Sequence, residues 1–141
     1  KEDGKRVELK DMTVKGSDGY GLCASNGLSF VLSFLCTRMT FGGSGVWAKN
    51  TKGRLNNCVI TQCGRSGIYC QRNALIELEG SQTKVDGNVT SGAFLHFGLN
   101  VFDSSSKIHL LFPLTKKSVS TNNRGRRNYG GKGTIKTVDS F

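Results

Sequence analysis

The sequence predicts an all-β solenoid, in which short strands wind around one apolar core and stack turn upon turn. A glycine followed by an apolar residue recurs at Gly21, Gly45, Gly67 and Gly98, at intervals of 24, 22 and 31 residues. The surrounding phrases repeat as well: Gly-Tyr-Gly-Leu-Cys-Ala, Gly-Ser-Gly-Val-Trp-Ala and Arg-Ser-Gly-Ile-Tyr-Cys. No window shows the i, i+3, i+4 apolar spacing that a helix of about ten residues needs.

Each repeat contains three candidate strands separated by polar turns. One strand follows the glycine. A second apolar segment comes before the glycine, at residues 12–14, 39–41 and 59–61, and a third follows the next turn, at 28–30, 54–55, 75–78 and 108–110. One turn of this kind cannot bury its own apolar face, so we expect turns to stack with parallel strand pairing. The alternative is a β-sandwich in which the glycines recur by coincidence.

The segment Asn-Cys-Val-Ile-Thr-Gln-Cys-Gly-Arg-Ser-Gly-Ile-Tyr at 57–69 carries a family resemblance. It is a close match to the right-handed parallel β-helix repeats of pectin-lyase-like proteins, and residues 7–110 resemble those repeats throughout. The chain is also loosely similar to uncharacterised β-helix proteins of marine microalgae. The resemblance implies a short right-handed parallel β-helix of about four rungs over 1–113. An irregular, basic Gly/Asn-rich cap or tail is expected over 114–141. Such a resemblance specifies a fold and says little about function.

Length and charge narrow the function classes. A chain of 141 residues is one domain's worth, and no stretch approaches the 18 uncharged apolar residues of a transmembrane helix. The net charge is +10, of which +6 falls in the last 28 residues. That density attracts nucleic acid, an anionic surface or an acidic partner. Because the chain begins with Lys1, we expect an excerpt or a processed product.

Alternation along the strand after each glycine predicts which side chains face inward. The expected inward ladders are Leu22, Val46, Ile68 and Leu99, and Ala24, Ala48, Cys70 and Val101. The expected outward columns are Cys23, Trp47, Tyr69 and Asn100, and Ser25, Lys49, Gln71 and Phe102. We predict an aromatic binding platform formed by Trp47, Tyr69, Lys49, Gln71 and Phe102, which would stack on sugar rings or dock a partner. The alternative register slips by one residue and places Trp47 and Tyr69 in the core.

The five cysteines predict core thiols rather than a metal site. Their spacing lacks the paired C-x2-C units of a zinc site, and an odd number cannot pair completely within one chain. Cys36 and Cys58, 22 residues apart, are expected to stack in a geometry poorly suited to a disulfide. We therefore expect a reducing intracellular or organellar compartment rather than secretion.

No catalytic constellation emerges from the sequence. Enzymes of the resembled family use clustered aspartates or a calcium site, whereas the acidic residues here fall at different phases of the repeat. His96 and His109 lie among apolar residues and are interpreted as structural groups. No phosphate-binding glycine loop is present. We expect no enzyme activity, no catalytic residue, no metal and no cofactor.

The basic C-terminal segment supplies a second candidate contact surface. Its cations are Lys116, Lys117, Arg124, Arg126, Arg127 and Lys132. We favour a cap that also docks a partner, with an edge strand over Thr134–Val138, while the alternative is an RNA-binding arm.

The predicted function is therefore a non-catalytic binding or scaffolding module. We expect it to dock on an acidic protein partner within a larger assembly. Two alternatives remain open: a carbohydrate-binding domain related to polysaccharide lyases and hydrolases, and an RNA- or ribosome-associated accessory protein.

Overall fold

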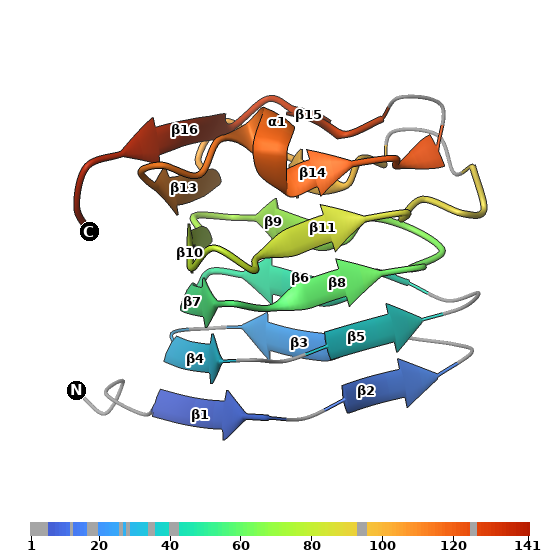
Figure 1. Ribbon diagram of the computed structural model, residues 1–141. Helices are drawn as coiled ribbons and strands as arrows, with labels where there is room; N and C mark the ends of the chain where they lie inside the picture. Colours follow the sequence, from blue (N-terminus) through green and yellow to red (C-terminus); the bar gives the residue numbers. More distant parts are fainter. Residues whose placement is uncertain are drawn as a thin grey trace.

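The computed structural model describes residues 6–11, 13–16, 20–25, 27, 29–33, 36–39, 43–92, 96–124 and 127–141. Their strands stack turn upon turn into a parallel β-helix that runs from the N-terminal strand at one end to the C-terminal strand at the other (Figure 1). The predicted all-β solenoid is confirmed. The helix α1 (Lys116–Val119) spans a single turn, and within the described part of the chain no helix is long and apolar enough to cross a membrane.

Each turn contributes one strand to each of three parallel sheets, named A, B and C. Sheet A contains β1 (Arg6–Lys10), β4 (Ser29–Ser33), β7 (Lys52–Asn56), β10 (Leu75–Glu79), β13 (Lys107–Leu111) and β16 (Thr134–Val138). Sheet B contains β2 (Thr13–Gly16), β5 (Cys36–Met39), β8 (Val59–Thr61), β11 (Lys84–Asp86) and β14 (Ser120–Thr121). Sheet C contains β3 (Leu22–Ser25), β6 (Val46–Lys49), β9 (Ile68–Gln71), β12 (Leu99–Val101) and β15 (Tyr129–Gly131).

The solenoid has about five turns, so the predicted number of four was one too low. The missed turn lies in the C-terminal segment, where β14 and β15 extend sheets B and C and β16 extends sheet A. Tyr129 is the register partner of Leu99. Asn128 therefore occupies the position that is a glycine before the sheet C strands of the earlier turns. The repeat that identified the other turns is therefore absent from the sequence here. The strand expected over Thr134–Val138 is β16.

The inward ladders of sheet C have the predicted register. Leu22, Val46, Ile68 and Leu99 are successive partners, as are Ala24, Ala48, Cys70 and Val101. Sheet A adds the ladder Leu32, Leu55, Leu78 and Leu110, all buried. Full burial of one such Leu or Ile side chain stabilises the fold by roughly 1.5–3 kcal/mol. These stacked side chains form the core that holds the turns together.

The glycine before the sheet C strands β6, β9 and β12 is required by packing at the corner. A Cβ atom on Gly45 would lie 2.5 Å from Cγ2 of Ile60, and one on Gly67 would lie 2.4 Å from Cγ1 of Val85. Ile60 and Val85 belong to strands of sheet B in the following turn. A larger residue would push the stacked turns apart. This close contact explains why a glycine recurs at this position of the repeat.

Polar side chains satisfy the backbone at the turn between sheets B and C. The side-chain oxygen of Asn88 accepts from the backbone N–H of Cys63 at 3.0 Å, and that of Asn123 accepts from the N–H of Asn88 at 2.8 Å. The Asn88 amide also donates to the carbonyl of Ile60 at 3.1 Å. These backbone groups are buried, and each one left without a hydrogen bond would cost roughly 1–3 kcal/mol. The asparagine side chains remove that cost.

The predicted stacking of Cys36 on Cys58 is wrong. Cys36 is the register partner of Val59, so Cys58 lies one residue out of step in the chain. The Cys58 thiol is buried and donates to the carbonyl of Leu32 at 3.4 Å. The pairing of Cys36 with Cys58 was predicted from the residue interval between neighbouring turns of sheet C. The interval between the same turns is different along sheet B.

Candidate functional site

The outer face of sheet C carries an aromatic strip, formed by Tyr20, Trp47, Tyr69 and Phe102. Trp47 on β6 and Tyr69 on β9 are direct register partners, and both side chains point outward and are half-buried. Val46 and Ala48, on either side of Trp47, are fully buried. The alternative register, with Trp47 and Tyr69 in the core, is therefore wrong.

The rings of the strip form two contacting pairs, one at each end of the strip. The centroids of Tyr20 and Trp47 are 5.6 Å apart with an interplanar angle of 31°. Those of Tyr69 and Phe102 are 5.8 Å apart at 23°, and this pair is stacked. Tyr20 and Phe102 are 42% and 49% exposed, so both ends of the strip offer apolar surface to a ligand. The structure thus brings together the three aromatic residues that the sequence singled out.

Tyr20 was missed by the sequence reasoning. It immediately precedes Gly21, a position that is Ser44 and Ser66 in the next two turns. Because the repeat points to a small polar residue at this position, nothing in the pattern marks Tyr20 as part of an aromatic surface.

Asn100 was expected in the exposed outward column, and this expectation is wrong. Its side chain is 1% exposed and donates to Oγ of Ser66 at 3.2 Å. The longer connection between β11 and β12 places His96 here, with its ring 5.7 Å from that of Tyr69. Beyond Tyr69, the strip therefore continues to Phe102 rather than to Asn100, and His96 lies beside it.

Polar residues border the strip on the side toward sheet A. Lys49 and Gln71 are register partners beside Trp47 and Tyr69, as predicted from the outward alternation. Beyond them lies an open hollow at the edge of the sheet. Its lining residues are Lys49, Asn50, Arg72, Asn73, Asp103 and Ser105. Two cations and two amides therefore lie within reach of a ligand placed on the rings.

The one carboxylate of this hollow is held by structural hydrogen bonds. Asp103 accepts from the backbone N–H of Arg72 at 2.8 Å and from the hydroxyls of Ser105 and Ser106 at 2.7 and 2.8 Å. Burial acts to raise the pKa of Asp103, but these hydrogen bonds prevail and lower it. The group is thus an ionised turn-stabilising acceptor.

His96 and Ser66 form a buried polar contact next to the strip. Oγ of Ser66 lies 3.0 Å from Nδ1 of His96 and also accepts from the backbone N–H of Phe97 at 3.3 Å. Burial, reinforced by the charge of Arg65, lowers the pKa of His96. Ser66 is fully buried, and its contact with the half-buried His96 ties the β11–β12 connection to the sheet.

His109 differs from the satisfied structural group that the sequence predicted. Its Nε2 is buried, and the described residues offer it no hydrogen-bond partner. It faces Glu77 and Lys136 on the neighbouring strands of sheet A. Burial and the charges of Lys136 and Lys107 lower the pKa of His109, against a smaller opposing effect of Glu77.

Two acidic residues outside sheet C also have structural partners. Glu77 accepts from Nη2 of Arg54 at 3.0 Å, and Asp86 accepts from the hydroxyl of Thr121 at 2.7 Å. Within the described ranges, no group of three His, Cys, Asp or Glu side chains is arranged to hold a metal ion.

The cations of the C-terminal segment belong largely to the last turn of the solenoid. Lys116 lies over the ring of Tyr129, with Nζ 4.6 Å from its centroid, and Nη1 of Arg124 donates to the carbonyl of Thr90 at 2.8 Å. Lys117 and Lys132 are exposed, while Arg127 is partly buried. Arg126 lies outside the described residues.

The family model described as a right-handed β-helix region matches residues 1–133. No curated protein and no solved structure matches the chain significantly.

Proposed function

Because the chain belongs to the right-handed β-helix family and carries an aromatic strip on sheet C, we propose that it is a non-catalytic binding module. The strip is its contact face. Single exposed apolar residues are ordinary on protein surfaces, but several rings gathered on neighbouring turns of a rigid sheet are typical of a binding surface. The two ring pairs, joined by the register partners Trp47 and Tyr69, are the observation that carries the proposal.

The charge around the strip indicates an acidic partner. Lys49 and Arg72 border the rings, and the chain as a whole has a net charge of +10. Aromatic side chains supply contact area at low entropic cost, and the bordering cations favour a partner of opposite charge. An acidic protein docked in a larger assembly fits both features.

A carbohydrate chain is the second candidate ligand, and the geometry of the strip favours it specifically. Within the two pairs the rings are tilted by only 31° and 23°, so each pair presents a shallow apolar surface. Gln71, Asn50 and Asn73 lie beside it with amide groups that can donate to and accept from hydroxyls.

The absence of catalysis is also part of the proposal. Hydrolysis of a glycosidic bond needs two carboxyl groups flanking the bond. Beside the strip, Asp103 is committed to Arg72 of the preceding turn and to Ser105 and Ser106 of its own turn. We therefore expect binding without turnover.

A direct test compares ligands and variants in one experiment. Acidic and neutral oligosaccharides, poly-glutamate and a single-stranded RNA are immobilised, and wild type, Trp47→Ala, Tyr69→Ala and Phe112→Ala are passed over them. Phe112 is the matched control, because it is 67% exposed but lies outside sheet C. Retention on poly-glutamate supports the acidic partner and retention on oligosaccharides supports the carbohydrate.

In either case, the two strip variants should lose binding while Phe112→Ala keeps it. Equal binding by Trp47→Ala and wild type would overturn the strip as the contact face. Retention on RNA alone would overturn both ligand assignments.

A further inference from the structure

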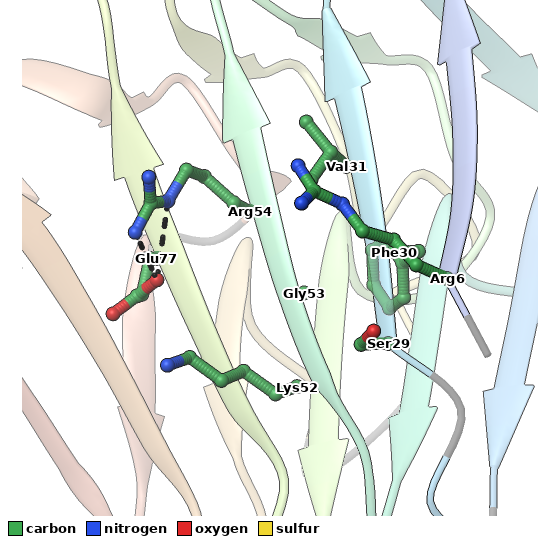
Figure 2. A pocket seen from close by; sticks show the side chains of 8 residues that line it. All are labelled: Arg6, Ser29, Phe30, Val31, Lys52, Gly53, Arg54 and Glu77. Carbon is green, nitrogen blue, oxygen red and sulfur yellow. Dashed lines mark hydrogen bonds and ion pairs between the residues drawn. The ribbon is translucent and has the colours of Figure 1, made fainter. Parts of the chain in front are cut away.

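Sheet A carries a hollow on its outer face that the proposed function does not use. It is an open depression of about 230 Å³ over β4 and β7 (Figure 2). The hollow lies on a different sheet from the aromatic strip, so it would bind a second ligand independently. Its volume is several times the roughly 30 Å³ that one water molecule occupies in the liquid.

The hollow arises from the register of three neighbouring strands. Arg6, Ser29 and Lys52 are successive partners on β1, β4 and β7, and Val31 and Arg54 are partners on β4 and β7. The central strand, β4, thus presents only the short side chains of Ser29 and Val31. On β7 these are flanked by Lys52 and Arg54, and on β1 by Arg6 and Glu8. Figure 2 shows Arg6 on one side, Arg54 and Lys52 on the other, and Ser29 and Gly53 between them.

The lining is strongly positive. It contains three cations and one carboxylate, that of Glu77. Glu77 is 4% exposed and lies against Arg54, which donates to it through Nη2 at 3.0 Å and through Nε at 3.2 Å. Arg6 and Lys52 are both exposed, and no salt bridge joins either of them to an acid of the described residues. This ion pair, the approach of Nε to Glu79 at 4.0 Å and the ring of Phe141, 4.7 Å from Cζ, fix the Arg54 guanidinium at the edge of the hollow, whereas Arg6 and Lys52 are exposed.

The spacing of these cations suits one compact anion. Arg6 and Lys52 lie two strands apart, which places their Cα atoms about 9.5 Å from each other. Long side chains rooted at that distance can close on a single group from opposite sides. A carboxylate has two acceptor oxygens, whereas a tetrahedral oxyanion has three or four and can accept from several cationic side chains at once.

We propose that the hollow of sheet A is a binding site for a tetrahedral oxyanion, a phosphate or a sulfate, held by Arg6, Lys52 and Arg54. The anion can be free or can be an ester group on a larger molecule. Arg54, already oriented by Glu77, supplies a fixed guanidinium, and the two flexible cations close over the ligand.

The test measures binding of inorganic phosphate, sulfate, methyl phosphate and acetate by isothermal titration calorimetry at low ionic strength. Two double variants are compared with wild type. Arg6→Gln/Lys52→Gln removes two cations of the hollow. Lys10→Gln/Lys107→Gln removes two exposed cations of the same sheet that lie outside it. Both double variants lose two positive charges. Comparing them therefore distinguishes a specific binding site from general electrostatic attraction of anions to the protein.

We expect wild type to bind phosphate or sulfate with a stoichiometry of one. Loss of two charged hydrogen-bond donors should weaken this binding roughly tenfold or more in Arg6→Gln/Lys52→Gln. The Lys10→Gln/Lys107→Gln control should bind as wild type does. Tighter binding of inorganic phosphate than of methyl phosphate identifies a free anion, and the reverse identifies an ester.

Three results would overturn the proposal: no saturable binding, equal weakening in both double variants, or acetate binding as tight as that of phosphate. Circular dichroism and melting curves verify that both variants fold. All four positions are exposed, where single charges contribute little to stability.

Discussion

The ring of Phe30 occupies the space that a side chain on Gly53 would need. The two residues are register partners on β4 and β7, and a Cβ atom built on Gly53 would lie 2.1 Å from Cζ of the ring. Phe30 is 2% exposed, so its ring belongs to the core. A large and a small residue are thus matched across two turns of the solenoid.

Gly53→Ala should therefore destabilise the protein. Overpacking of a filled core costs typically ~1–3 kcal/mol, and we expect an effect in that range from chemical denaturation. Phe30→Leu, which vacates the space, should reduce the cost of Gly53→Ala in a double-mutant cycle. Additive effects of the two substitutions would show that the ring and the glycine are not coupled.

A second prediction concerns the inward ladder of sheet C. Ile68→Asp should abolish cooperative folding, because an unpaired buried carboxylate costs several kcal/mol against a total domain stability of roughly 5–15 kcal/mol. Ser25→Asp is the control, since Ser25 is exposed on the same sheet beside Lys49. Thermal melts followed by circular dichroism distinguish the two. A folded Ile68→Asp variant with a native-like melt would contradict the assigned register.

A third prediction concerns pH. Burial lowers the pKa of both His96 and His109 in the folded protein, with help from Arg65 for the first and from Lys136 and Lys107 for the second. Below the unfolded value of about 6.5, the unfolded chain therefore binds more protons than the folded one. Stability should be constant above that pH and should fall as the pH drops through it toward the folded pKa.

Melting temperatures recorded across that range measure the effect, and His96→Asn/His109→Asn should flatten the curve. A melting temperature that rises as the pH falls below the unfolded histidine pKa would show that the imidazolium forms are favoured by the fold.

Much of the fold could be predicted because sheet C repeats its sequence. The glycine before Val46 and Ile68 is required by packing at each corner, so the period is visible in the chain. Alternation then separates inward from outward residues and correctly places Trp47 beside Tyr69. The fifth turn was missed because Asn128 and Tyr129 replace the glycine and the apolar residue that marked the others.

Features that depend on unequal turn lengths could not be predicted. Cys36 was expected to face Cys58, but the corners of sheet B shift it to Val59. Asn100 has an outward position in the register, yet it is buried and donates to Ser66. The hollow of sheet A joins Arg6, Ser29 and Lys52 across three turns whose strands carry no common sequence pattern.

The most direct test of the aromatic strip uses the fluorescence of Trp47, which is the only tryptophan in the chain and therefore reports on the strip alone. Wild type, Tyr69→Ala and Phe112→Ala are titrated with acidic oligosaccharides and with poly-glutamate. We predict a saturable change in Trp47 emission with one of these probes in wild type and in Phe112→Ala, and its loss in Tyr69→Ala. Saturable binding of a probe, detected by calorimetry, that leaves Trp47 emission unchanged would contradict the account, because the ligand would then occupy another face.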